Sequence, residues 1–94
     1  MQKLQQMRVA LVLLLSEEHT KLQRQHRRLA GMEIEIMGAE RDHAAGTLPT
    51  AKLDQLYKED RVTKETLEEI ETEITRMEQV LAKIDVDIVE MCRS

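Results

Sequence analysis

The residues of this chain that could do chemistry are its histidines, one cysteine and a run of carboxylates, and their spacing builds no site. His19 and His26 are seven residues apart. On a helix this spacing places them on one stripe but about 10 Å apart along the axis, too far to share a metal ion without other ligands. The acidic run Glu65–Glu73 lacks the alternating loop ligands and the turn glycine of a calcium-binding loop. We therefore expect no metal and no cofactor.

Catalytic motifs are equally absent, so we expect no enzyme. The three glycines are isolated, and the sequence contains no phosphate-cradling loop, nucleophile elbow or CxxC pair. A single cysteine, Cys92, cannot form an internal disulfide and fits a reducing compartment. The net charge of −4, with both signs interspersed, offers no basic field to nucleic acid. We expect an intracellular protein, cytoplasmic or alternatively nuclear, that binds no nucleic acid.

The composition favours long helices in a single domain, residues 1–94. The chain has no Trp or Phe, one Tyr and one Pro, and 34% of its residues are charged. Leu, Ile, Met, Glu, Lys, Arg and Gln dominate, and these residues lose little rotamer freedom in a helix. Because the helical pattern continues to both ends, we expect the chain to be part of a longer protein.

A heptad seam runs through the second half of the chain. Its apolar residues alternate spacings of three and four, the signature of a and d positions in a coiled coil: Leu67, Ile70, Ile74, Met77, Leu81, Ile84, Ile88 and Met91. Traced backward, the seam continues through Thr63, Asp60, Leu56 and Leu53. This pattern predicts a helix over about residues 51–92.

The first half predicts a second helix, over about residues 2–45, with a break in its frame. One seam contains Leu4, Met7, Leu11 and Leu14. The other contains Leu15, Glu18, Leu22, Gln25, Leu29, Met32, Ile36 and Ala39. The two frames differ by four residues, which is a stutter that would locally unwind a supercoil.

A short loop at about residues 46–50 should join the two helices. Gly46 suits a helix C-terminus, Pro49 cannot continue a helix, and Thr47 and Thr50 are candidate N-caps. The expected fold is all-α, an antiparallel two-helix hairpin of the coiled-coil type. A swapped dimer, in which each chain stays extended through 43–50 and pairs with another chain, would satisfy the same pattern.

Charges flanking the seams agree with the hairpin, because e and g positions of paired helices carry opposite signs. Folding about Pro49 brings His19 toward Glu78 and three further pairs together: His26 with Glu71, Arg28 with Glu73, and Glu33 with Lys64. At the free end the seams match best as Leu4 with Met91, Met7 with Ile88, Leu11 with Ile84, and Leu14 with Leu81.

Apolar residues beyond the seam predict an interface. The run Val9–Leu15 is apolar on every side of a helix, yet it is far shorter than the 18 or so residues of a membrane span. Six residues have no role in the hairpin: Val9, Val12, Leu13, Val80, Val86 and Val89. A two-stranded coil buries only a narrow stripe, so we expect these residues to be covered by a second copy, giving a homodimeric four-helix bundle.

Two functions are compatible with this arrangement. The first is a non-catalytic oligomerisation or scaffold module that assembles proteins through the free end of the hairpin. The alternative is a heterotypic adaptor or effector in which the same surface binds a partner helix or a regulatory protein. In outline such a hairpin is similar to helical fingers that bind small GTPases and to three-helix co-chaperone adaptors, a resemblance of shape alone.

Overall fold

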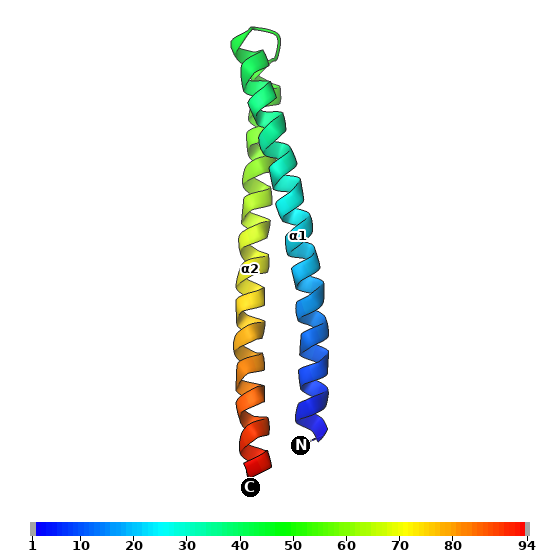
Figure 1. Ribbon diagram of the computed structural model, residues 1–94. Coiled ribbons are helices and arrows are strands. Elements are labelled where there is room, and N and C mark those ends of the chain that lie inside the picture. The colour runs from blue at the N-terminus through cyan, green and yellow to red at the C-terminus, as the bar shows by residue number, and fades with distance from the viewer. Residues whose placement is uncertain (1, 94) are drawn as a thin grey trace. The chain divides into compact units, whose positions relative to one another are not determined.

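A computed structural model of the chain describes residues 2–93 and contains two long helices, α1 (Gln2–Ala44) and α2 (Thr50–Arg93). No strand occurs in this range, which confirms the all-α, two-helix architecture (Figure 1). The helices contribute to two compact units. The terminal unit joins α1 up to Leu22 with α2 from Ile70 onward. The turn unit contains Gln23–Glu69.

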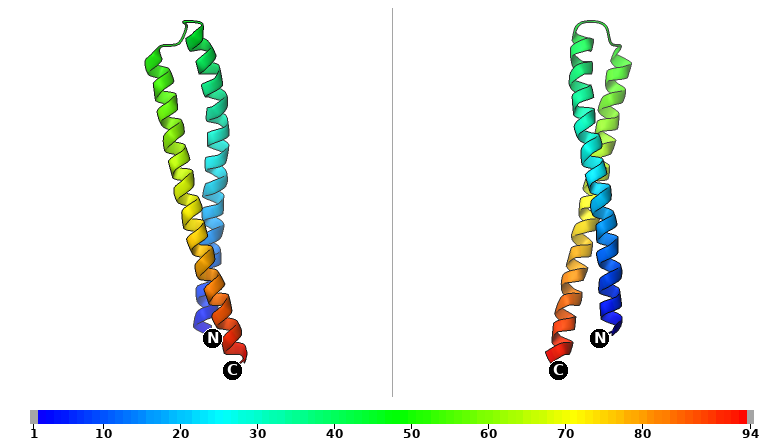
Figure 2. Two further views of the ribbon diagram at one scale, coloured as in Figure 1. Left: turned by 90° about the vertical axis from the view of Figure 1, so that its left-hand side faces the viewer. Right: turned by 45° about the vertical axis from the view of Figure 1, so that its right-hand side comes forward.

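In the turn unit, the chain reverses direction at residues 45–49 through a glycine-dependent helix cap (Figure 2). Gly46 has φ 81°, in the left-handed region that side chains disfavour. The Thr47 N–H donates to the Asp42 carbonyl at 2.9 Å, and the Gly46 N–H donates to the His43 carbonyl at 3.0 Å. This pair of bonds is a Schellman motif, which satisfies carbonyls that the end of α1 leaves without helical partners.

The two threonines expected as N-caps have other roles. The Thr47 hydroxyl donates to the Asp42 carbonyl at 3.0 Å, so it reinforces the end of α1. Thr50 is already the first residue of α2, and its hydroxyl lies 3.0 Å from Nε2 of His43. The Pro49 carbonyl accepts the first helical bond of α2, from Lys52 at 3.1 Å. The missing N–H of proline is no loss here, because the first N–H groups of a helix have no carbonyl partner.

Burial along α2 follows the spacing expected from the sequence. Every seam position from Leu53 to Ile88 is buried or half-buried, including the polar positions Asp60 and Thr63. Asp60 in this seam pairs with Lys64 of its own helix at 2.9 Å, while its Oδ1 is buried without a hydrogen-bond partner. At the end of the seam, Met91 is 46% exposed, so it is not enclosed between the helices.

Burial along α1 differs from the predicted stutter. Leu15 is buried, whereas Leu14 and Met7 are 47% and 46% exposed. The buried and half-buried residues from Leu4 through Leu11 and Leu15 to Ala39 fit one unbroken frame, in which Arg8 takes the position assigned to Met7. Met7 and Leu14 are therefore flanking residues rather than seam residues. The frame is continuous because the long Arg8 side chain can leave the seam and keep its charge in water.

Each unit has its own small core. In the terminal unit, Leu15, Ile74 and Met77 form a buried cluster against which Leu11, Leu22, Ile70 and Leu81 pack. In the turn unit the buried side chains are Met32, Ile36, Ala39, Leu53 and Thr63. The Thr63 hydroxyl donates to the Glu59 carbonyl of its own helix at 2.8 Å, and it lies 3.4 Å from the sulfur of Met32 on α1. Among residues 2–93, no large side chain falls below 2% exposure, as expected for a core one layer thick.

Candidate interaction surface

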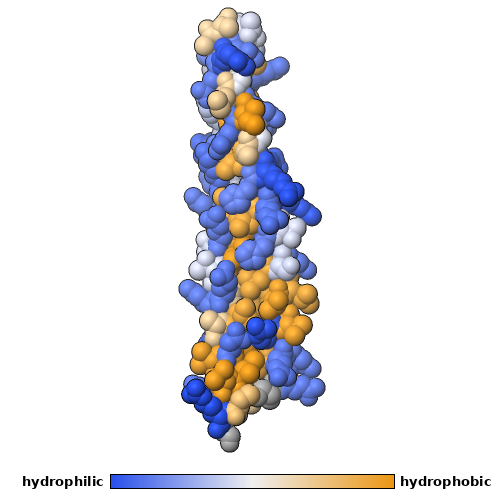
Figure 3. All heavy atoms as spheres, viewed as in Figure 1, coloured by the Kyte–Doolittle hydropathy of each residue, from blue (hydrophilic) through white to orange (hydrophobic). Residues whose placement is uncertain are grey.

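Exposed apolar side chains gather in the terminal unit. All six residues expected at the interface are exposed, with Leu13 at 62% and Val9 at 59% the most open. Val12, Val80, Val86 and Val89 are exposed by 40–55%. Met7, Leu14 and Met91 extend the set. The space-filling view of Figure 3 shows several groups of hydrophobic atoms, with hydrophilic ones between them, over these helix ends. Single exposed apolar residues are ordinary on a protein surface, so it is their number on these two helix ends that makes the terminal unit a candidate contact surface.

The heptad frame divides these residues between two sides of the terminal unit. Leu15 and Leu81 are assigned to heptad position a. The residues at positions e and b of both helices then lie on one side of the seam, and the residues at positions g and c lie on the other. We call these the e face and the g face. The e face holds Val9, Val12 and Val89, with Leu13 and Val86 at its outer edge. The g face holds Met7, Leu14 and Val80.

The e face is poor in charge. Along its b and e positions, from Gln2 to Val12 and from Ala82 to Cys92, the only charged residue is Asp85. A shallow hollow on α1 beside this face is lined by uncharged residues alone: Gln2, Gln5, Gln6, Val9, Ala10 and Leu13. Depletion of charge around apolar side chains is characteristic of the buried centre of protein interfaces.

An ion pair joins the two helices at the e face. The Arg8 Nε lies 2.7 Å from the Asp85 Oδ1, and both side chains are 47% exposed. Arg8 starts from the seam and Asp85 from a flanking e position. Because a guanidinium has five N–H donors and a carboxylate has two oxygens, a single bond leaves donors and an acceptor available for further partners.

The g face differs in its surroundings. Its g and c positions bring charge close to the apolar centre: Lys3 on α1, and Lys83, Asp87 and Glu90 on α2. A hollow at its end is lined by Leu4, Asp87, Glu90 and Met91, so two of its four residues are carboxylates. The g face is therefore apolar only along a narrow strip.

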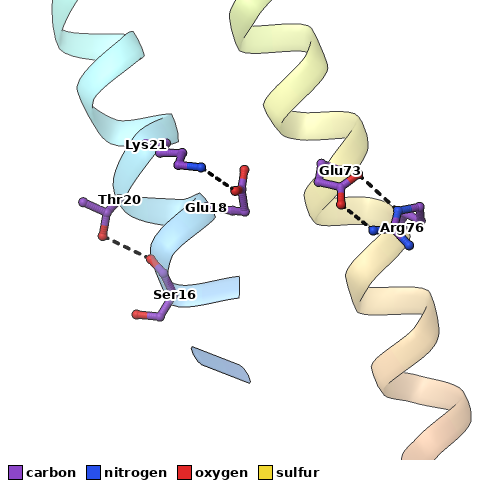
Figure 4. Close-up of polar contacts among 6 residues, drawn as sticks. All are labelled: Ser16, Glu18, Thr20, Lys21, Glu73 and Arg76. Atoms are coloured by element: carbon purple, nitrogen blue, oxygen red, sulfur yellow. Dashed lines mark hydrogen bonds and ion pairs between the residues drawn. The ribbon is translucent and has the colours of Figure 1, made fainter. Parts of the chain in front are cut away.

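Two residues of the four ion pairs predicted across the hairpin, Glu73 and Lys64, bind a partner on their own helix instead, as Figure 4 shows for Glu73. Glu73 binds Arg76 of its own helix rather than Arg28. Glu18, at a seam position, binds Lys21 at 2.9 Å. Neither His26 and Glu71 nor His19 and Glu78 form an ion pair within the described range 2–93. Partners three or four residues away on one helix are already close, so less side-chain entropy is lost.

These local pairs shift the titration of their members. The hydrogen bond from Arg76 lowers the pKa of the Glu73 carboxyl. A hydrogen bond to Asp60, with a smaller contribution from Glu33 across the pair, raises the pKa of the Lys64 ammonium. The predicted attraction between Glu33 and Lys64 is thus present, but Lys64 has its closest partner on its own helix.

The turn unit exposes a smaller apolar patch that lies outside the interface predicted from the sequence. Ile34 and Met37 lie three residues apart on α1, and each is 72% exposed. The heptad frame gives them outward f and b positions, so counting from Ile36 would have identified them.

A separate hollow near the turn is lined by Glu35, Gly38, Ala39, Asp42, Leu48, Lys52, Gln55 and Leu56. Nearby, partial burial and the Glu40 carboxylate raise the pKa of the Tyr57 phenol.

Other kinds of site find no support in the described residues. No group of three or more His, Cys, Asp or Glu side chains within 2–93 is arranged to hold a metal ion. Over the same range, neither helix contains a stretch long and apolar enough to cross a membrane. Comparison with known proteins gives no match to a protein-family model, to a curated protein or to a solved structure.

Proposed function

We propose that this chain is a non-catalytic self-association module, a coiled-coil hairpin whose terminal unit pairs with that of a second copy to form a four-helix bundle. The observation that carries this proposal is the concentration of exposed large apolar side chains in the terminal unit, on both of its helices. Burying such side chains stabilises an assembly by roughly 1.5–3 kcal/mol for each one fully covered.

The total surface area supports the same proposal. The chain exposes 7100 Å² at a mass of 10.9 kDa, whereas a compact monomer of that mass exposes about 5,600 Å². The excess is more than the roughly 800 Å² that one partner buries in an interface of standard size.

Sedimentation equilibrium or light scattering on the purified chain tests the proposal. We expect a dimer at micromolar concentration, and a well-folded helical monomer would overturn it. The Leu13→Glu variant should dissociate the dimer, because a carboxylate would be placed in the apolar contact. The matched control is Ile34→Glu, which puts the same charge at an even more exposed apolar position of the turn unit. The control should remain dimeric.

A second candidate function is heterotypic binding, in which the hairpin is an adaptor or effector for another helical protein. The patch of Ile34 and Met37 favours it, because this patch lies outside the terminal unit. A partner protein that binds the wild type and Leu13→Glu equally, and fails to bind a variant carrying Ile34→Glu and Met37→Glu, would establish this function. We further propose an intracellular location, since the single exposed cysteine, Cys92, has no partner for an internal disulfide.

A further inference from the structure

We infer that the two copies meet through the e face, with Arg8 of each copy opposite Asp85 of the other, so that this ion pair sets the register of the dimer. The inference rests on the proposed self-association and names the surface and geometry involved. It separates the two apolar sides of the terminal unit, only one of which would form the primary contact.

The first argument is the charge surrounding each side. The e face has Val9, Val12 and Val89 with uncharged neighbours, and the Arg8–Asp85 pair cancels its own charge. The g face has Lys3, Lys83, Asp87 and Glu90 beside its apolar strip. Removing those four charges from water would cost free energy that an unrelated partner surface would have to compensate. Association through the e face would remove only Arg8 and Asp85 from water, and these two are already paired with each other.

The second argument identifies the occupant as a second copy. A two-fold interface must be self-complementary, because residue i of one copy meets residue j of the other and the reverse. The e face carries one cation and one anion, 2.7 Å apart and on opposite helices. A copy rotated by 180° brings its anion to the cation and its cation to the anion. A strongly basic or strongly acidic partner helix would find no matching net charge there.

The third argument is the unused bonding capacity of the pair. The contact within the chain uses the Arg8 Nε and the Asp85 Oδ1. Within residues 2–93 no other hydrogen bond is formed by the Arg8 guanidinium. Both side chains are 47% exposed and so accessible to another molecule. Two such pairs meeting at the two-fold axis can form a four-membered network, the kind of polar layer that fixes register in helical bundles.

A mixing experiment with charge variants tests the inference. Arg8→Asp gives a face with two anions, and Asp85→Arg gives a face with two cations. Each variant alone should dimerise about tenfold or more weakly than the wild type, because like charges meet across the axis. An equimolar mixture should form a heterodimer, detected by native mass spectrometry, with affinity near the wild-type value. An Arg8–Asp85 contact that acted only within one chain would not be restored by mixing.

The matched control places the same charge changes on the g face. Lys83→Asp and Asp87→Arg alter the net charge by equal amounts and should neither weaken the homodimers comparably nor pair selectively on mixing. If the g-face variants mix selectively and the e-face variants do not, the inference is wrong while self-association stands. A wild type that is monomeric overturns the proposed function itself.

A second comparison decides the matter if the charge variants fail to fold. Val12 and Leu14 are two residues apart on α1 and have similar exposure, 40% and 47%. Val12 lies on the e face, whereas Leu14 lies on the g face. Circular dichroism should show both Val12→Glu and Leu14→Glu to be helical. Val12→Glu should raise the dimer dissociation constant at least tenfold more than Leu14→Glu does. Equal effects, or the reverse order, would refute the e face as the contact.

Discussion

The terminal unit and the turn unit are built from the same two helices in the same heptad frame, yet they treat apolar residues in opposite ways. In the turn unit the seam contains Asp60 and Thr63, and the exposed large apolar side chains outside it are spread over both helices: Ile34, Met37, Tyr57 and Val62. In the terminal unit the buried cluster around Leu15, Ile74 and Met77 is apolar, and further apolar side chains cover both flanks. The heptad seam pairs the two helices in both units. The units differ in the residues outside the seam, and it is those residues that decide whether a surface is polar enough to stay in water or apolar enough to be a candidate contact surface.

The same contrast appears in the ion pairs. Lys64 and Asp60 bind within α2 of the turn unit, and Glu73 and Arg76 bind within α2 of the terminal unit. Arg8 and Asp85, by contrast, join α1 to α2 at the e face. Exposed local pairs of this kind contribute little to stability. The Arg8–Asp85 pair is also 47% exposed on both sides, so it differs from the local pairs in the helices that it joins rather than in its burial.

The largest difference between the units should appear when a buried seam side chain is truncated. Ile74→Ala removes an apolar side chain, 5% exposed, from the terminal cluster and should lower the free energy of unfolding by about 2–4 kcal/mol. Thr63→Ala, at a position 4% exposed in the turn unit, should cost less than about 1.5 kcal/mol, since its lost hydrogen bonds are partly offset by the better helix propensity of Ala. Urea denaturation at one protein concentration measures both. Equal losses would contradict the contrast between the cores.

Replacing a buried carboxylate should stabilise the turn unit. Asp60 occupies a seam position, and its Oδ1 is buried with no hydrogen-bond partner. Asp60→Leu exchanges this group for an apolar side chain suited to the seam and should raise the free energy of unfolding by about 1–3 kcal/mol. Asp54→Leu, at an exposed position of the same helix, is the control and should change stability much less. A destabilised Asp60→Leu variant would indicate that the carboxylate is better satisfied than its contacts suggest.

Replacing Gly46 of the turn and Gly31 of α1 by alanine should change the free energy of unfolding in opposite directions. Gly46 has φ 81°, so Gly46→Ala should lower the free energy of unfolding by about 1–2 kcal/mol. Gly31 lies within α1, where an added methyl group would meet nothing within 4 Å. Gly31→Ala should raise stability by about 0.5–1 kcal/mol because alanine has the better helix propensity. Thermal unfolding of the two variants, measured in parallel, tests this difference. The same sign for both would be inconsistent with it.

The smallest expected effect is on the pH dependence of the two local ion pairs. The pKa of Glu73 is lowered below its ordinary value of 4.5, so the pair in the terminal unit stabilises the fold above that pH and loses its contribution as the pH falls through the folded pKa. The pKa of Lys64 is raised above 10.5, so the pair in the turn unit contributes below that pH and is lost as the pH rises through the folded pKa.

Side-chain NMR titration should detect these shifts, with Arg76→Ala abolishing the first and leaving the second unchanged. Glu73, Arg76 and Lys64 are all exposed, so the change in stability that accompanies their titration should be slight. An Arg76→Ala variant that altered the Lys64 titration would show that the pairs are not independent.

The all-α fold and the seam of α2 could be predicted because the residues at its positions differ clearly from their neighbours. Leu67, Ile70, Ile74 and Met77 are separated only by polar residues, so a single heptad frame is apolar there. Near the N-terminus the predicted heptad frame was wrong, because Met7 and Leu14 are as apolar as Leu11 and Leu15. Hydrophobicity alone cannot choose between two frames there. Arg8, a charged residue in the correct frame, made that frame look wrong.

The candidate surface was only partly predictable for a related reason. Val9, Val12 and Leu13 could be identified as surplus once one seam was assigned. Their division from Met7, Leu14 and Val80 into two faces required the correct frame. The cross-helix ion pairs were overestimated because sign agreement does not exclude a nearer partner, such as Arg76 for Glu73. The sequence reports which charges are compatible, whereas side-chain reach decides which of them meet.

The turn at Gly46 also bears on the order in which the hairpin folds. His43 and Thr50, which meet beside it, are seven residues apart in sequence, whereas Arg8 and Asp85 are separated by 77. The entropy lost on closing a loop grows with loop length, so contacts near the turn are the least costly to form first. Pairing would then extend toward the chain ends and complete the terminal unit last. The surface proposed for self-association would thus be complete only in fully folded chains.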